Sequence, residues 1–237
     1  MSVKKNLIYI ALILASGLGF TCRHNGVAGD EGTRGPDSVT LTVLYTNDEH
    51  GWMEADGDFS GAAGMYSAWS ALAGDARGDD VLILSGGDNW SGPAVSTWFQ
   101  GESMVEVMNG MGYDAAATGN HEFDFGPAVF AERAEEAGFP YLSANITPVP
   151  DYISPYVIEK VAGVRVGIIG LTTQSTPFTT FSAHVEGLEF IPYKKALAET
   201  VPEARAAGAE LLIVVAHVPG EELEMLAAAA DSLGSPL

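Results

Sequence analysis

The sequence is poor in cysteine and in basic residues. Cys22 is the single cysteine among 237 residues, which excludes an intramolecular disulfide and a metal site built from thiolates. Lysine and arginine number 11 against 31 aspartates and glutamates, giving a net charge of −20 at pH 7. Because such a surface repels phosphate backbones and anionic lipids, we expect no nucleic-acid polymer as a partner. An anionic small molecule stays acceptable as a substrate if bound metal cations supply positive charge.

The N-terminal apolar run is too short for an ordinary membrane-spanning helix. It covers residues 7–15, follows Lys4 and Lys5, and has the length of a secretory signal core. We therefore expect residues 1–22 to be a signal peptide and the protein to be exported, to the periplasm or the cell surface.

Cys22 directly follows the signal core. This position resembles a bacterial lipoprotein attachment site and favours a lipid anchor to the membrane, although Thr21 is bulkier than the residue usually found before such a cysteine. Ordinary cleavage further on, for instance after Ala28, is the alternative. Residues 23–38 are polar and rich in glycine, which predicts a flexible tether to a domain spanning residues 39–237.

Apolar, β-branched segments alternate with helical patterns through that domain, which predicts an α/β fold. The expected strands are residues 39–46, 79–84, 115–118, 141–144, 157–161, 164–170 and 210–216. The expected helices are residues 61–73, 102–111, 127–137, 194–207 and 221–233, and residues 172–190 are expected to form a long irregular loop.

Four of the expected strands end in groups that bind divalent cations. These groups are Asp48 with His50, Asp88, Asn120 and His217. Each alone also fits a structural role, as a turn residue or a buried histidine bonded to the backbone. Their common position at strand ends favours a site for Zn, Mn, Fe or Mg, because oxygen and imidazole ligands suit these ions. If Asp48 and His50 continue an extended strand, their side chains point to the same side.

The stretch from Gly119 to Gly126 forms the loop between a short buried strand and a helix that begins at Pro127. Loops at the carboxyl ends of strands are where α/β proteins place ligands and catalysis. His121 lies beside the candidate ligand Asn120, and Asp124 is close enough in sequence to orient the imidazole of His121.

In combination these motifs resemble the calcineurin-like metallophosphoesterases, and within them the secreted 5′-nucleotidases. The motifs that carry the resemblance are TNDEHG at 46–51, SGGD at 85–88, GNHEFD at 119–124 and AH at 216–217, with LSANI at 142–146 and GLTT at 170–173. The resemblance implies a four-layer α/β/β/α sandwich with the metals at one edge, truncated before its last strands.

The resemblance also implies a role for each matching residue. Asp48 and His50 would hold one cation, Asn120 and His217 the other, and Asp88 would bridge both. His121 would be catalytic, stabilising the transition state and assisting the leaving oxygen, with Asp124 orienting it. Glu122 would be a supporting residue, and Asn145 would contact the substrate phosphate.

The implied activity is metal-dependent hydrolysis of phosphate esters, chiefly nucleoside 5′-monophosphates. A 2′,3′-cyclic-nucleotide phosphodiesterase, a nucleotide-sugar hydrolase, a sulfur-ester hydrolase or an inactive exported binding module are the alternatives. The family's next motif, Gly-His-x-His, does not occur in these residues, so we expect a C-terminally incomplete enzyme. Residues 1–237 alone should bind metal weakly and hydrolyse nucleotides poorly or not at all.

The N-terminal pattern predicts export with removal of the signal segment. Mass spectrometry of protein expressed in a bacterium should find a mature N-terminus at Cys22, carrying a lipid. An intact Met1 on cytoplasmic protein would contradict the export, whereas a mature N-terminus beyond Cys22 would contradict only the lipid anchor.

Overall fold

The computed structural model describes residues 12–14, 39–57, 60–74, 78–222, 224 and 226. The predicted tether, Cys22 and most of the predicted helix at 221–233 lie outside these residues, as does all of the predicted signal peptide except residues 12–14. Among the described residues, no helix has both the length and the apolar character needed to cross a membrane.

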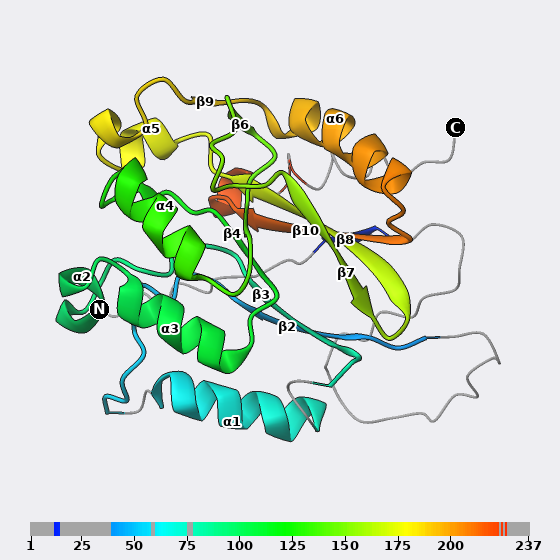
Figure 1. Cartoon of the computed structure of the whole chain (residues 1–237), viewed down its shortest axis with the longest axis horizontal. Helices are drawn as coiled ribbons and strands as arrows, with labels where there is room; N and C mark the ends of the chain where they lie inside the picture. Colours follow the sequence, from blue (N-terminus) through cyan, green and yellow to red (C-terminus); the bar gives the residue numbers. More distant parts are fainter. Residues whose placement is uncertain are drawn as a thin grey trace.

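Two four-stranded sheets form the centre of the molecule (Figure 1). The first consists, in spatial order, of the parallel strands β2 (Thr42–Thr46), β3 (Val81–Ser85), β4 (Ala115–Ala117) and β5 (Tyr141–Leu142). The second consists of β1 (Leu12–Leu14), β10 (Leu211–His217), β8 (Val164–Thr172) and β7 (Tyr156–Val161). In this second sheet β10 and β8 are parallel, and the outer strands β1 and β7 run antiparallel to their neighbours.

The remaining elements connect the strands and cover the sheets. The helices are α1 (Gly61–Ala73), α2 (Ala94–Trp98), α3 (Glu102–Met111), α4 (Pro127–Glu136), α5 (Thr176–Thr179) and α6 (Tyr193–Ala206). Short 3₁₀ turns are η1 (His121–Phe123), η2 (Ser182–His184) and η3 (Gly220–Glu222), and a small antiparallel pair is formed by β6 (Ile146–Thr147) and β9 (Glu189–Phe190).

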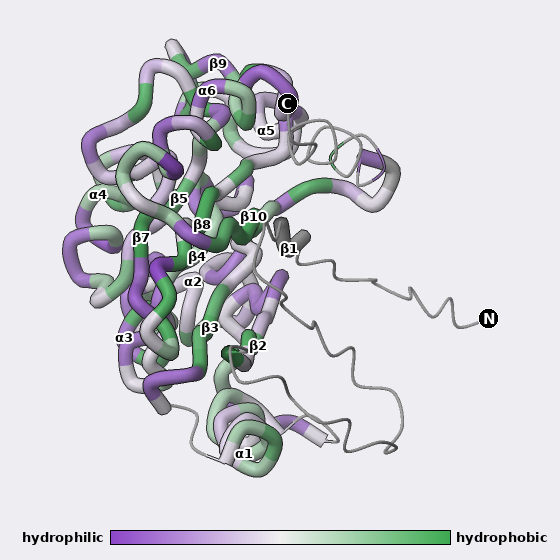
Figure 2. Tube along the Cα trace, turned by 90° about the vertical axis from the view of Figure 1, so that its right-hand side faces the viewer, coloured by the Kyte–Doolittle hydropathy of each residue, from purple (hydrophilic) through white to green (hydrophobic). Residues whose placement is uncertain are grey.

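Side chains that alternate along the strands build three apolar layers. Leu82 and Leu84 on β3 point into the space between the two sheets, whereas Val81 and Ile83 pack on the side of α1, α3 and α4. On β10, Ile213 faces the first sheet and its neighbours along the strand face α6. Figure 2 shows β3, β4, β8 and β10 as hydrophobic segments in the middle of the molecule. The order of layers is helix, sheet, sheet, helix, which confirms the α/β/β/α sandwich.

The predicted elements agree with the structure wherever an apolar pattern is long. The boundaries of α1 and α3 are as predicted, and the hairpin of β7 and β8 turns at Ala162 and Gly163. The prediction of one irregular loop over 172–190 was wrong, because this segment contains the end of β8, α5, η2 and β9. The short helix α2 was not predicted.

The two sheets are joined at the edge where the predicted ligands lie. The hydroxyl of Thr172, at the end of β8, donates to the carbonyl oxygen of Thr118 after β4 at 2.7 Å. In the register of the second sheet, Thr172 is opposite His217 at the end of β10. The carboxyl ends of strands from both sheets therefore meet at one place.

Gly170 on β8 allows this close approach, and it generates a stability prediction. A Cβ atom at Gly170 would collide with the backbone carbonyl and Cβ of Leu142 on β5, in the opposite sheet. We expect Gly170→Ala to lower the free energy of unfolding by about 1–3 kcal/mol, the usual cost of overpacking. The control is Gly110→Ala in α3, where the added methyl enters open space and should stabilise by about 0.5–1 kcal/mol. Urea unfolding measures both, and equal midpoints for the two variants would contradict the tight contact between the sheets.

Candidate metal centre

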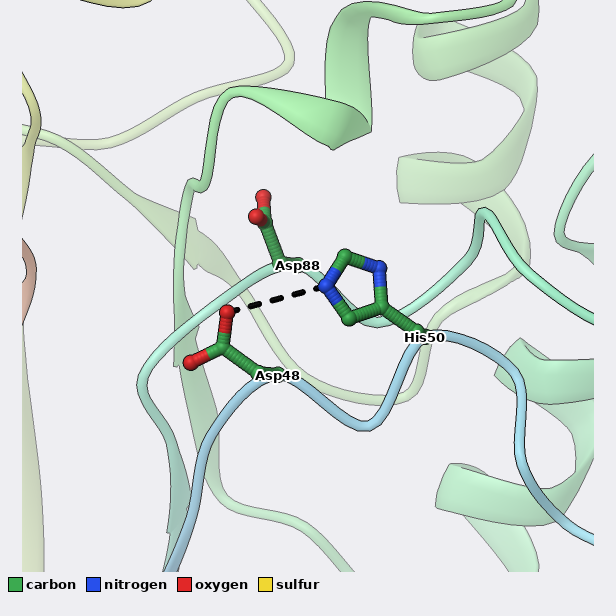
Figure 3. A group of neighbouring side chains, drawn as sticks. All are labelled: Asp48, His50 and Asp88. Atoms are coloured by element: carbon green, nitrogen blue, oxygen red, sulfur yellow. Dashed lines mark ion pairs between the residues drawn. The ribbon is translucent and has the colours of Figure 1, made fainter. Parts of the chain in front are cut away.

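Three predicted ligands converge on one point. Asp48 and His50 follow β2, Asp88 follows β3, and one ligand atom from each lies within 4.8 Å of the other two. Figure 3 shows the side chains of Asp48 and His50 pointing toward each other beside Asp88, and the Nε2 atom of His50 lies 3.6 Å from Oδ1 of Asp48. Two carboxylates and one imidazole are a suitable donor set for a hard or borderline divalent cation.

The backbone that presents these groups is not extended. Asp48, His50 and Asp88 have φ angles of 56°, 46° and 57°, so each occupies the left-handed region. The expectation that Asp48 and His50 share a side because a strand continues was wrong, since β2 ends at Thr46. The side chains converge because the loop turns twice. Non-glycine residues in this region carry a conformational cost, and such cost gathers at functional sites.

His217 joins the centre from the other sheet. Its Nε2 atom lies 3.0 Å from Oδ2 of Asp88, while its Nδ1 atom donates to the carbonyl oxygen of Gly86 at 3.1 Å. His50 follows the same pattern, with Nδ1 donating to the carbonyl oxygen of Ser91 at 2.8 Å. In both rings the backbone carbonyl fixes the tautomer and leaves Nε2 on the side of the carboxylates, which is how proteins orient metal-binding histidines.

The charges of Asp88 and His217 depend on each other. Burial would raise the pKa of Asp88, but the hydrogen bond and charge of His217 outweigh it and lower that pKa. Burial would likewise lower the pKa of His217, but Asp88, with Asp48 and Glu122 nearby, raises it to about 9. In the metal-free protein at neutral pH, a proton on His217 therefore compensates the buried carboxylate. A divalent cation would supply that positive charge in its place.

Asn120 lies next to this pair. The side chain is 7% exposed, and its amide nitrogen donates to the carbonyl oxygen of Thr179 at 3.2 Å. The amide oxygen is thus the atom available to a cation. The following residue, His121, donates its backbone N–H to Oδ1 of Asp88 at 2.8 Å, which holds the Asn120 loop against the central carboxylate.

The side chains of His121 and Asp124 form a separate pair. Nδ1 of His121 lies 2.7 Å from Oδ2 of Asp124, and this hydrogen bond is the main cause of a raised pKa at His121. The imidazole rings of His121 and His50 meet edge to face with their centroids 5.3 Å apart. His121 is therefore beside the three convergent ligands, and its second nitrogen, Nε2, is not used by Asp124.

Glu122 is completely buried and ties two site loops together. Its Oε2 atom accepts from the backbone N–H groups of Gly119 at 2.7 Å and Asp88 at 2.9 Å. Its Oε1 atom accepts from the backbone N–H of Asn89 at 2.7 Å and from the side-chain amide of Asn89 at 3.2 Å. Burial, and then the charge of Asp88, raise the pKa of Glu122. The sequence alone suggested a supporting role for Glu122 but gave no sign of this network, because two of its partners, Asp88 and Asn89, are more than 30 residues away along the chain.

The substrate-binding role predicted for Asn145 finds no support in this geometry. Asn145 is fully buried, its amide nitrogen donates to the carbonyl oxygen of Thr172 at 2.8 Å, and its amide oxygen accepts from the N–H of the same residue at 2.8 Å. The amide nitrogen and the amide oxygen of Asn145 are therefore both hydrogen-bonded to the backbone of β8. As placed, Asn145 fastens the loop after β5 to the second sheet.

Comparisons with known proteins agree with the fold. No family model matches the chain. A snake venom 5′-nucleotidase of Gloydius brevicauda is 39% identical over 156 residues, covering 59% of this chain and 26% of the venom protein. The crystal structure of a 5′-nucleotidase precursor from Thermus thermophilus superposes with a TM-score of 0.68 at 30% identity, over 79% of this chain and 39% of that one. A calcineurin-like phosphoesterase of Bacillus subtilis superposes with a TM-score of 0.64 at 25% identity, over 75% of this chain and 61% of that one.

A metal-binding edge on this sandwich defines the calcineurin-like phosphoesterases, whose fold implies the use of divalent metal ions. Within that class, the chain belongs to the family of the 5′-nucleotidases. It spans about a quarter of the length of the venom relative, at 26%.

The network around Glu122 generates a prediction about stability. Glutamine at position 122 keeps the shape of the side chain but has one acceptor oxygen, so two of the four donors lose their partner. Each buried donor left unsatisfied costs about 1–3 kcal/mol, and we expect Glu122→Gln to destabilise the metal-free protein by at least that amount. The matched control is Glu135→Gln on the exposed face of α4. If the two variants have the same thermal unfolding midpoint, the relief of repulsion between Glu122 and Asp88 offsets the lost hydrogen bonds, and the predicted destabilisation is wrong.

Proposed function

We propose that this chain carries out metal-dependent hydrolysis of phosphate esters, chiefly nucleoside 5′-monophosphates or related nucleotides, outside the cytoplasm. The observation that supports it best is the central position of Asp88. Its Oδ2 atom is paired with His217, and its carboxylate also lies in the cluster with Asp48 and His50. A carboxylate between two sets of ligands suits a bridging role in a two-metal site.

The proposed ligand sets follow from this arrangement. Asp48 and His50 would hold one cation, Asn120 and His217 would hold the other, and Asp88 would be shared. Bound there, two divalent cations would neutralise charge on the phosphoryl oxygens and make a water molecule more acidic. The donors fit such ions, because each imidazole presents Nε2 and each acidic residue presents a carboxylate oxygen.

His121 and Asp124 would carry the proton chemistry. With Nδ1 bound to Asp124, His121 has Nε2 free to hold a proton near the leaving oxygen of the ester. The negative charge of Asp124 favours the protonated imidazole, which would also stabilise negative charge that develops on the phosphoryl group. Neither residue is proposed as a metal ligand.

Three observations support export. The apolar run after Lys4 and Lys5 has the length of a signal core, one relative is a venom protein, and the Thermus structure is described as a precursor. We propose residues 1–22 as the signal segment, with cleavage before Cys22 so that this cysteine stays as the site of lipid attachment, and residues 23–38 as a tether.

The experiment that tests the proposed function measures hydrolysis of a panel of substrates by the Mn²⁺-loaded chain, with the products separated by chromatography. The panel contains AMP, 2′,3′-cyclic AMP and a nucleotide sugar, and millimolar Mn²⁺ compensates for weak binding. We expect phosphate release from AMP above that of Asp88→Ala protein. If the protein converts only the cyclic nucleotide to a nucleoside monophosphate, or only the nucleotide sugar to a nucleoside monophosphate and a sugar phosphate, the substrate assignment changes but the metal-dependent ester hydrolysis stands. Metal binding without hydrolysis of any substrate would indicate an inactive binding module and contradict the proposal.

The different roles of His121 and Asp88 predict different defects. His121→Ala should lower kcat by about 10²–10⁴-fold, the range for general acid catalysis, while both metals stay bound. Asp88→Ala should instead lose or scramble both metals, because the carboxylate is shared. Asp80→Ala, at the exposed residue directly before β3, is the matched control for Asp88→Ala. Metal content by mass spectrometry and turnover of AMP decide the matter, and metal loss from His121→Ala as large as from Asp88→Ala would contradict these roles.

A further inference from the structure

The carboxylate of Asp124 is held by more than its histidine. Oδ2 accepts from Nδ1 of His121 at 2.7 Å and from the hydroxyl of Ser91 at 2.6 Å. Oδ1 accepts from the hydroxyl of Thr180 at 2.9 Å. The three donors come from three different segments of the chain, the loops after β3 and β4 and the connection between α5 and η2. Together they fix the plane of a carboxylate that otherwise rotates about a soft torsion.

Ser91 connects this carboxylate to the metal centre. Its carbonyl oxygen accepts from Nδ1 of His50 at 2.8 Å, and its hydroxyl donates to Asp124. One residue thus sets the direction of a candidate metal ligand and of the acid that orients His121.

The segment at Thr179 and Thr180 also makes one contact with a candidate metal ligand and one with Asp124. The carbonyl oxygen of Thr179 accepts from the amide of Asn120, and the hydroxyl of Thr180 donates to Asp124. Two unrelated segments therefore each hold one candidate ligand and one oxygen of Asp124. His121 itself is one-third exposed, at 34% of its side chain, and Asp124 is the partner of its ring nitrogen Nδ1. The orientation of its ring depends on how firmly Asp124 is held.

We propose that Ser91 and Thr180 are positioning residues that lock Asp124, and through it the His121 imidazole, in register with the metal ligands. Loss of either hydroxyl would leave the ligands in place but let the carboxylate turn and the imidazole swing away from the leaving oxygen. The catalytic consequence rests on the proposed hydrolysis, whereas the locking itself does not.

The test of the locking uses ¹⁵N-labelled histidine in the full chain and follows exchange of the His121 Nδ1 proton with water by NMR. We expect a slowly exchanging proton in the wild type, identified by its absence in His121→Ala. Ser91→Ala and Thr180→Val should each speed its exchange by about 10-fold or more, the factor that corresponds to one hydrogen bond to a charged group. Thr180→Ser keeps the hydroxyl and should restore slow exchange. Ser182→Ala, an exposed serine of η2, is the matched control and should behave as the wild type.

Turnover with two leaving groups tests the consequence. Ser91→Ala and Thr180→Val should lower kcat for AMP by about 10–100-fold, with KM and bound metal within about 2-fold of the wild type. p-Nitrophenyl phosphate, whose leaving group departs without a proton, should be affected far less. Equal losses for both substrates, or loss of metal, would indicate a merely structural role and overturn the inference. Unchanged proton exchange would overturn it as well. If the wild type hydrolyses neither substrate, the proposed function fails and proton exchange alone decides the locking.

Discussion

The site depends on one electrostatic constraint, the burial of the Asp88 carboxylate. Asp88 is 3% exposed, and its own backbone N–H donates to the carboxylate of Glu122, which is fully buried. Two neighbouring buried carboxylates are stable only if positive charge or hydrogen-bond donors compensate them. Glu122 takes four N–H donors, and Asp88 takes a backbone N–H and the imidazole of His217. The burial of these two carboxylates therefore favours the binding of a divalent cation at Asp88, because the cation adds compensating positive charge.

The sandwich fold brings together the groups that compensate the buried Asp88 carboxylate. The parallel strands of the first sheet and β10 of the second deliver their carboxyl ends to the same edge, so His217 reaches Asp88 although 129 positions of chain, from 88 to 217, separate them. Gly119 has no Cβ, and a Cβ there would collide with the Asp88 carboxylate. Left-handed backbone at Asp48, His50 and Asp88 then turns the ligands inward. Strain in these loops is tolerated because the apolar layers on either side of each sheet fix the strand ends.

The sequence allowed the fold class and the strand-end residues to be predicted, because long apolar runs and polar strand ends are local patterns. Asp48, His50, Asp88 and His217 meet as expected, although the reason expected for the first two was wrong. The four donors on Glu122, the two hydroxyls on Asp124 and the internal role of Asn145 were not predicted. Apart from the contact of Gly119 with Glu122, these contacts join residues far apart in sequence, where no periodicity signals them. The short elements α2, α5 and β9 were missed for the related reason that segments of five, four and two residues carry too little pattern.

The central claim is that Asp88 is shared by two cations, and anomalous diffraction from crystals soaked in millimolar Mn²⁺ tests it most directly. We expect two anomalous peaks separated by about 3.5–4 Å, the spacing of two-metal sites, with the Asp88 carboxylate between them. One peak should lie beside Asp48 and His50 and the other beside Asn120 and His217. A single peak at Asp48, His50 and Asp88, with His217 still paired to Asp88, would contradict it.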